Sequence, residues 1–176
     1  MISIIYVFWM YVILFAIIGM LRGWAKELLV GFAVVVAVAL NFLLHTYAPM
    51  VNKLPESDLT LFWVRIIVLG AMTYFGYQTV ISVARLQAGA RRERLQDSLF
   101  GLFLGAINGY LVTGTFWSYW AAANYPGGFY QSVENNAAVQ RTIAAMLEYM
   151  PPHLLGSPGI YFAVIIVLIF ILVVYV

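Results

Sequence analysis

The most chemically distinctive stretch of the chain lies between its first two apolar segments, where charged residues and glycines alternate. Arg22 and Lys26 are four residues apart, so on a helix both side chains point the same way. Glu27 can pair with either cation or cap the following segment, and Gly19 and Gly23 permit a tight reversal or a close helix contact. The pattern predicts a hinge at a membrane surface. It lacks the spacing of a P-loop, so a phosphate cradle is not favoured.

Other candidate catalytic or ligand-binding residues are few. The chain has 2 histidines, His45 and His153, and each could ligate a metal, a haem or a chlorophyll. No cluster of carboxylates lies near either of them in sequence, so interfacial or turn histidines are favoured. Ser157 follows His153 closely, but the adjacent Pro158 argues against an activated serine. Because cysteine and the common hydrolase, protease and nucleotide motifs are missing from the sequence, we expect no enzyme activity, no cofactor and no metal site.

The composition indicates which solvent surrounds these residues. Of the 176 residues, 64% are hydrophobic and only 9% are charged, whereas an ordinary soluble domain has about 25% charged residues. Such a chain could not cover its surface with polar groups, and an aromatic content of 16% excludes intrinsic disorder. A net charge of +2 gives no reason to expect a nucleic-acid partner. We therefore expect the lipid bilayer to be the main partner of the surface.

The long apolar runs predict a single membrane domain over residues 1–176. Backbone groups in lipid need internal hydrogen bonds, so these runs should be helices, which makes the fold class all-α and polytopic. The five predicted spans cover residues 2–20, 28–44, 61–84, 99–123 and 160–176. The first span has no preceding basic residue and no cleavage site, so we expect a retained helix rather than a signal peptide.

The last span is short for a membrane crossing. At about 1.5 Å per residue it would extend about 25 Å, whereas the hydrocarbon core is about 30 Å thick. Either the helix tilts in a thin membrane, or the natural chain continues beyond Val176. The second explanation is favoured.

Basic residues in the connections predict the orientation, because cytoplasmic loops carry more Lys and Arg. The richer side would carry Arg22, Lys26, Arg85, Arg91, Arg92 and Arg94, and the other side Lys53, Arg65 and Arg141. The richer side should be cytoplasmic, which places the N-terminus outside and the C-terminus inside. The cluster in the third connection can also attract anionic lipid headgroups, although a solvated topology signal is the plainer interpretation.

The fourth connection, residues 124–159, contains the pattern of an amphipathic helix. Apolar residues recur on one face from Val133 to Met150, and polar residues such as Glu134 and Glu148 fall mostly elsewhere. We expect a helix on the outer surface that lies on the membrane, covers the bundle or receives a partner.

Small residues in the fourth span predict close helix packing. Gly101, Gly105 and Gly109 recur every four residues and line one stripe, on which another backbone can pack in lipid. Asn108 shares that face and needs a partner inside the bundle. Span two offers a matching stripe of small residues at Ala33, Ala37 and Asn41. The candidate partners of Asn108 in span three are Thr73, Gln78 and Thr79. Adhesion between helices is favoured over a polar path through the bundle, because the sequence places no Asp, Glu or Lys at mid-membrane depth.

Two segments of the sequence together resemble the colicin V production (CvpA-like) family of bacterial inner-membrane proteins. The first runs from Ile18 to Leu29 and the second from Asp97 to Gly109, and their order and spacing fit the family. The resemblance covers about residues 1–155. It implies a multi-spanning plasma-membrane protein associated with peptide toxin production or export, or with envelope upkeep. The family commonly has a basic residue at the position of Asn108 and usually ends after four spans, so span five would be an addition.

The sequence supports three functional hypotheses. The first is a non-enzymatic membrane protein that acts through helix packing and through contacts of span five and the outer helix with other membrane proteins. The second is an accessory or scaffold subunit of a respiratory or photosynthetic complex. The third is a small transporter or channel. The residues expected to matter are Gly19, Gly23, Gly101, Gly105, Asn108 and Gly109 for packing, and Arg22, Lys26, Glu27, Arg91, Arg92 and Arg94 as charges at the inner surface.

Overall fold

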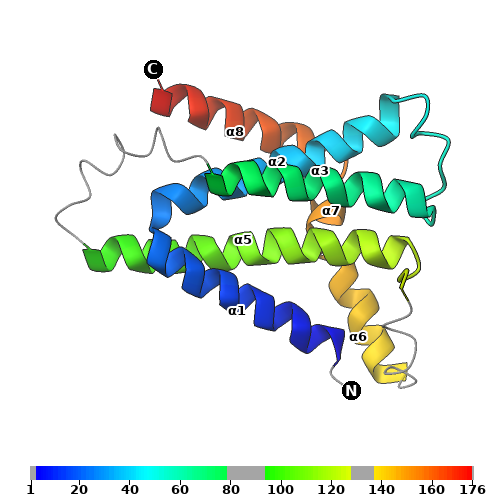
Figure 1. Ribbon diagram of the computed structural model, residues 1–176, viewed down its shortest axis with the longest axis horizontal. Coiled ribbons are helices and arrows are strands. Elements are labelled where there is room, and N and C mark those ends of the chain that lie inside the picture. Colours follow the sequence, from blue (N-terminus) through cyan, green and yellow to red (C-terminus); the bar gives the residue numbers. More distant parts are fainter. Residues whose placement is uncertain (1–2, 79–93, 128–136, 176) are drawn as a thin grey trace.

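The computed structural model describes residues 3–78, 94–127 and 137–175, and the regular structure within those ranges is helical (Figure 1). The bundle contains the long helices α1 (Ile4–Arg22), α2 (Trp24–Tyr47), α3 (Leu59–Gln78) and α5 (Arg94–Ala122). The shorter helices are α6 (Ala137–Glu148), α7 (Pro151–Leu154) and α8 (Gly159–Tyr175). The expected all-α membrane fold is confirmed.

The helix lengths fit a membrane protein. α1, α2, α3 and α5 are each long and apolar enough to cross a bilayer. Their bounds differ from the predicted spans: α5 begins at Arg94 rather than at residue 99, and residues 79–84 of the third predicted span lie outside the described residues. α8 is apolar but has only 17 residues, so a fifth crossing stays a prediction.

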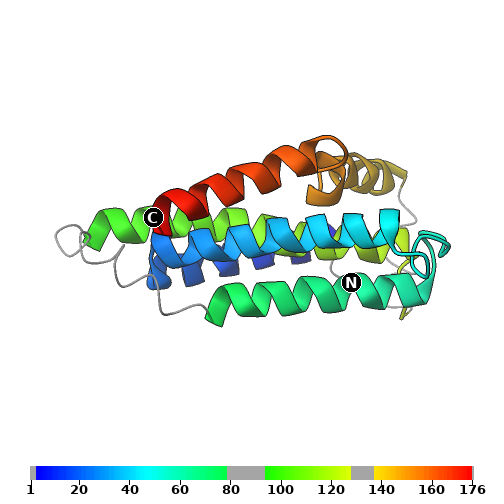
Figure 2. The same cartoon turned by 90° about the horizontal axis from the view of Figure 1, so that it is seen from above.

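α5 is the central helix of the bundle. α1 lies along one side of it and α2 along another, and α3 packs on both α2 and α5 (Figure 1). α8 lies against α2, on the side opposite to α3 (Figure 2). The start of α1, the α2–α3 loop, α6 and α7 gather at one end of the bundle, and the junction between α1 and α2 lies toward the other end (Figure 1).

α1 packs on α5 through glycines, which let the two backbones approach closely. An added Cβ at Gly19 would lie 2.7 Å from the Cα of Gly105, and one at Gly109 would lie 2.9 Å from the Cα of Val12. The glycine stripe of α5 therefore faces α1, and the expectation that it meets the small residues of α2 is wrong. Ala33 of α2 faces α3 instead, where an added Cβ on Gly76 would lie 2.8 Å from the Cβ of Ala33. Gly19 is the matching small residue on α1, so of the two roles expected for it, a tight reversal or a close helix contact, the structure shows the close contact.

The amphipathic helix α6 covers the ends of α1 and α5. Ile143 is 5% exposed and joins an apolar cluster with Phe8 of α1 and Trp117 of α5. The hydroxyl of Tyr110 on α5 donates a hydrogen bond to the carbonyl of Tyr149, just after α6. Of the placements expected for this helix, the structure shows packing on the bundle. Residue 133, where the predicted pattern began, lies outside the described residues.

We expect Gly105→Ala to destabilise the protein, because the new methyl group would have to displace the α1 backbone. Overpacking of this kind costs about 1–3 kcal/mol. Gly70→Ala is the matched control: an added Cβ there has no neighbouring group within 4 Å, so stability should stay equal or rise slightly. Thermal unfolding of the purified protein in a mild detergent measures both effects. Equal midpoints for the two variants would contradict the close contact between α1 and α5.

Candidate functional site

A single residue, Gly23, joins α1 to α2 and turns the chain back. Its φ of 86° lies in the region that favours glycine. Its N–H donates to the carbonyl of Gly19 at 2.9 Å, which closes the last turn of α1. Asp97 of α5 lies against the junction, where its Oδ1 accepts the N–H of Trp24 at 3.1 Å. An added Cβ on Gly23 would lie 2.7 Å from Oδ2 of Asp97, so both the backbone angle and the space require glycine.

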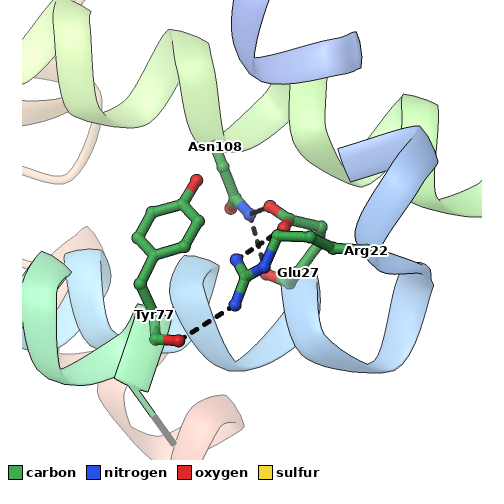
Figure 3. A network of polar contacts seen from close by, with 4 residues as sticks. All are labelled: Arg22, Glu27, Tyr77 and Asn108. Carbon is green, nitrogen blue, oxygen red and sulfur yellow. Dashed lines mark hydrogen bonds and ion pairs between the residues drawn. The ribbon is translucent and has the colours of Figure 1, made fainter. Parts of the chain in front are cut away.

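Arg22, just before Gly23, and Glu27, in the first turn of α2, form an ion pair that reaches into the bundle (Figure 3). Nη1 of Arg22 donates to Oε1 of Glu27 at 2.8 Å, and the Glu27 side chain is 0% exposed. Nη2 of Arg22 donates to the carbonyl oxygen of Tyr77 at 3.0 Å, near the end of α3. The same guanidinium lies 4.2 Å from the centroid of the Tyr77 ring, which is a cation–π contact.

Asn108 completes this arrangement from α5 (Figure 3). Its Nδ2 donates to Oε2 of Glu27 at 2.8 Å and to the backbone carbonyl of Glu27 at 2.7 Å. Both carboxylate oxygens of Glu27 therefore accept a hydrogen bond. Arg22, Glu27, Tyr77 and Asn108, which we call the polar cluster, come from α1, α2, α3 and α5. An unpaired carboxylate is very costly to bury, so these bonds are a condition for this packing.

The pairing of Glu27 with Arg22 is one of the contacts that the sequence allowed, but Glu27 is buried in the bundle and is not a surface charge beside Arg22 and Lys26. α2 begins at Trp24, earlier than the predicted span, so Glu27 is already in its first turn and points into the bundle. Lys26 is half-buried and Arg22 is 23% exposed, so these two cations stay closer to solvent. Glu27 lies in the first turn of α2, so the expectation that no Asp, Glu or Lys lies at mid-membrane depth stays a prediction.

One other expected contact differs in the structure. Thr73, Gln78 and Thr79 were the candidate partners of Asn108, but its amide donates to Glu27, and Thr79 lies outside the described residues. Asp97, in the first turn of α5, accepts the N–H of Trp24, the first residue of α2. Tyr77 was not among the predicted site residues. Tyr77 joins the polar cluster through its backbone carbonyl, a group that every residue has, and through the contact of its ring with the Arg22 guanidinium.

The remaining predicted residues fall outside the polar cluster. Gly101 lies beside Gly19 and Gly23, at the start of the α1–α5 contact. Arg94 is the first residue of α5, and Arg91 and Arg92 lie outside the described residues. Within residues 3–78, 94–127 and 137–175, no group of three or more His, Asp or Glu side chains could hold a metal ion. The chemistry that the cluster offers is a buried carboxylate neutralised by one guanidinium.

Comparison with known proteins gives a family match. The sequence model of a family described as colicin V production protein matches residues 6–148, a range that includes the whole polar cluster. No match was found among the curated proteins or among the solved structures.

We expect Arg22→Met to destabilise the protein by about 3–5 kcal/mol, because it leaves the buried carboxylate of Glu27 without its counter-charge. The double variant Arg22→Met/Glu27→Gln removes both charges and keeps an oxygen for Asn108, so it should recover most of that loss. Lys26→Met removes a neighbouring cation and should stay within about 0.5 kcal/mol of the wild type. Denaturant unfolding in mixed micelles measures these changes. A double variant less stable than Arg22→Met would show that the two charges are not paired.

Proposed function

The chain belongs to the colicin V production protein family, and we propose from this premise that it is a non-enzymatic membrane protein acting through helix packing and contacts with other membrane proteins. The family and the apolar helices indicate a bacterial inner-membrane protein. We place its role in peptide toxin production or export, or in envelope upkeep. The basic residues of the connections support an N-terminus outside and a C-terminus in the cytoplasm.

The observation that carries the proposal is the use of the buried polar groups. Arg22 and Asn108 both donate hydrogen bonds to Glu27 and so join α1, α2 and α5, while the glycine contact holds α1 along α5. In lipid, close packing and hydrogen bonds between helices are the interactions that hold a bundle together. A protein whose strongest polar groups serve this purpose is suited to keep a fixed shape that a partner can recognise.

α8 supports the part of the proposal that concerns partners. It contacts the bundle through α2, where Ile160 packs with Val38 and Ala39. The rest of its surface exposes the apolar side chains of Phe162, Ile165, Ile166, Leu168, Ile169, Leu172 and Val173. A helix held on one side leaves an apolar face for lipid or for a helix of another protein.

A photo-crosslinking residue at position 166 tests this contact in intact cells. Ile67 on α3 is the matched control, because Ile67 is 65% exposed and Ile166 is 64% exposed. We expect position 166 to give a discrete protein adduct and position 67 to give lipid adducts only, as identified by mass spectrometry after gentle extraction. Adducts to a respiratory or photosynthetic complex in fixed stoichiometry would identify the chain as its accessory subunit. Lipid adducts alone at both positions would contradict partner contact through α8.

A small transporter is the second candidate, because one observation favours it. Glu27 is a carboxylate buried in a membrane-spanning helix, and such groups commonly mark proton or ion pathways. In the transporter, Glu27 would have to exchange its proton while α1 moves. In the packing protein, Glu27 stays paired with Arg22.

Glu27→Gln separates the two candidates, because it removes the acid but keeps an acceptor for Asn108. The packing proposal expects that liposomes containing the wild type or the variant lose an imposed pH gradient as slowly as protein-free liposomes. The measurement is the fluorescence of an internal pH dye in vesicles of known protein content. A proton flux that the wild type shows and Glu27→Gln lacks would establish the transporter and overturn the packing proposal.

A further inference from the structure

Both histidines of the chain line one cavity, at the end of the bundle that carries the α2–α3 loop and α7. The cavity has a volume of about 400 Å³, which is within the range of small-molecule sites. His45 comes from the last turn of α2, and His153 comes from α7. We call this space the histidine cavity. Neither histidine belongs to the polar cluster, and the proposed function uses neither of them.

The titratable side chains that line the histidine cavity are His45, Glu56, Arg65, Tyr119 and His153. Nη1 and Nη2 of Arg65 donate to the two carboxylate oxygens of Glu56, at 2.5 and 3.1 Å. Nε2 of His45 lies 3.6 Å from Oε1 of Glu56. The Arg65 guanidinium also lies 5.0 Å from the centroid of the Tyr119 ring. Among the described residues that line this cavity, the carboxylate of Glu56 is the only negative charge.

The charge of the cavity depends on the two imidazoles. The hydrogen bonds and positive charge of Arg65 hold the pKa of Glu56 below its ordinary value, so Glu56 stays anionic in mildly acidic solution. With neutral imidazoles, Arg65 and Glu56 cancel each other. Histidine is in general the side chain whose charge changes between about pH 5 and pH 8. Protonation of both histidines leaves three cations facing one carboxylate.

The apolar walls make this excess of positive charge unfavourable on its own. Val38, Phe42, Ala122 and Leu155 line the same cavity. Repulsion between like charges is stronger beside such walls than in bulk water. An anion that entered the cavity would relieve this repulsion. By linkage, an anion that prefers the protonated cavity also draws protons onto the imidazoles.

We propose that the histidine cavity binds a small oxyanion, of the sulfate, phosphate or carboxylate class, together with the protonation of His45 and His153. The protonated imidazoles supply N–H donors and charge, while Arg65 stays paired with Glu56 and adds to the positive field. A free anion and the headgroup of an anionic lipid share this chemistry.

Sulfate is the probe for the test, because its charge stays constant between about pH 5.5 and pH 8. The full chain is held in nanodiscs of zwitterionic lipid, and calorimetry gives the dissociation constant. We expect sulfate to bind about tenfold more tightly at the lower pH. His153→Gln should remove most of this difference in affinity. Because His153 is exposed, the melting temperature of the His153→Gln variant at the higher pH should match that of the wild type. Lys53→Gln is the control, because Lys53 is an exposed cation of the α2–α3 loop and does not line the cavity.

Equal sulfate affinity at both pH values would overturn the proposal, and so would a pH dependence that persists in His153→Gln. Nanodiscs that contain an anionic lipid distinguish the two sources of the anion. Loss of sulfate binding in these nanodiscs would identify a lipid headgroup as the occupant, and its retention would identify a free anion.

Discussion

The need to neutralise a buried carboxylate accounts for much of the arrangement at the α1–α2 junction. Glu27 is 0% exposed, and Arg22, which pairs with it, is five residues earlier in the chain. On one continuous helix, residues five apart point about 140° away from each other. The break at Gly23 lets the guanidinium turn back toward the carboxylate. A helix hairpin with no loop is thus the geometry in which this acid can be buried with a counter-charge.

The second oxygen of Glu27 couples the junction to α5. Asn108 bonds both the side chain and the backbone carbonyl of Glu27, which fixes the position of α5 along α2. Room for the amide comes from Gly31, where an added Cβ would lie 2.9 Å from Oδ1 of Asn108. In this position, Gly101 and Gly105 of α5 lie opposite α1. The hydrogen bonds to α2 and the close backbone contact with α1 therefore reinforce each other, and α5 is held from two sides.

Hydropathy was sufficient to predict that helices exist, because lipid leaves the backbone no other partner for its hydrogen bonds. The amphipathic pattern also predicted α6, although not its packing against Phe8 and Trp117. Hydropathy could not place Glu27, because a charged residue at the edge of an apolar run is assigned to the surface, and its partner Asn108 is 81 residues away. Hydropathy could not identify the partner of the glycine stripe either, because spans one and two both offer small residues. Both histidines were assigned to turns or interfaces, and only the folded chain brings them to one cavity.

The central place of α5 has a consequence for synthesis of the protein. α1 and α2 leave the ribosome first, yet α1 packs mainly on α5, which is made much later. The contact between Arg22 and Glu27 is local, so the acid can enter the bilayer already neutralised while its amide partner is still untranslated. The side of α1 that carries Gly19 lacks its α5 partner during this interval. Final compaction of the nascent chain must therefore follow the insertion of α5, which makes assembly late and non-local.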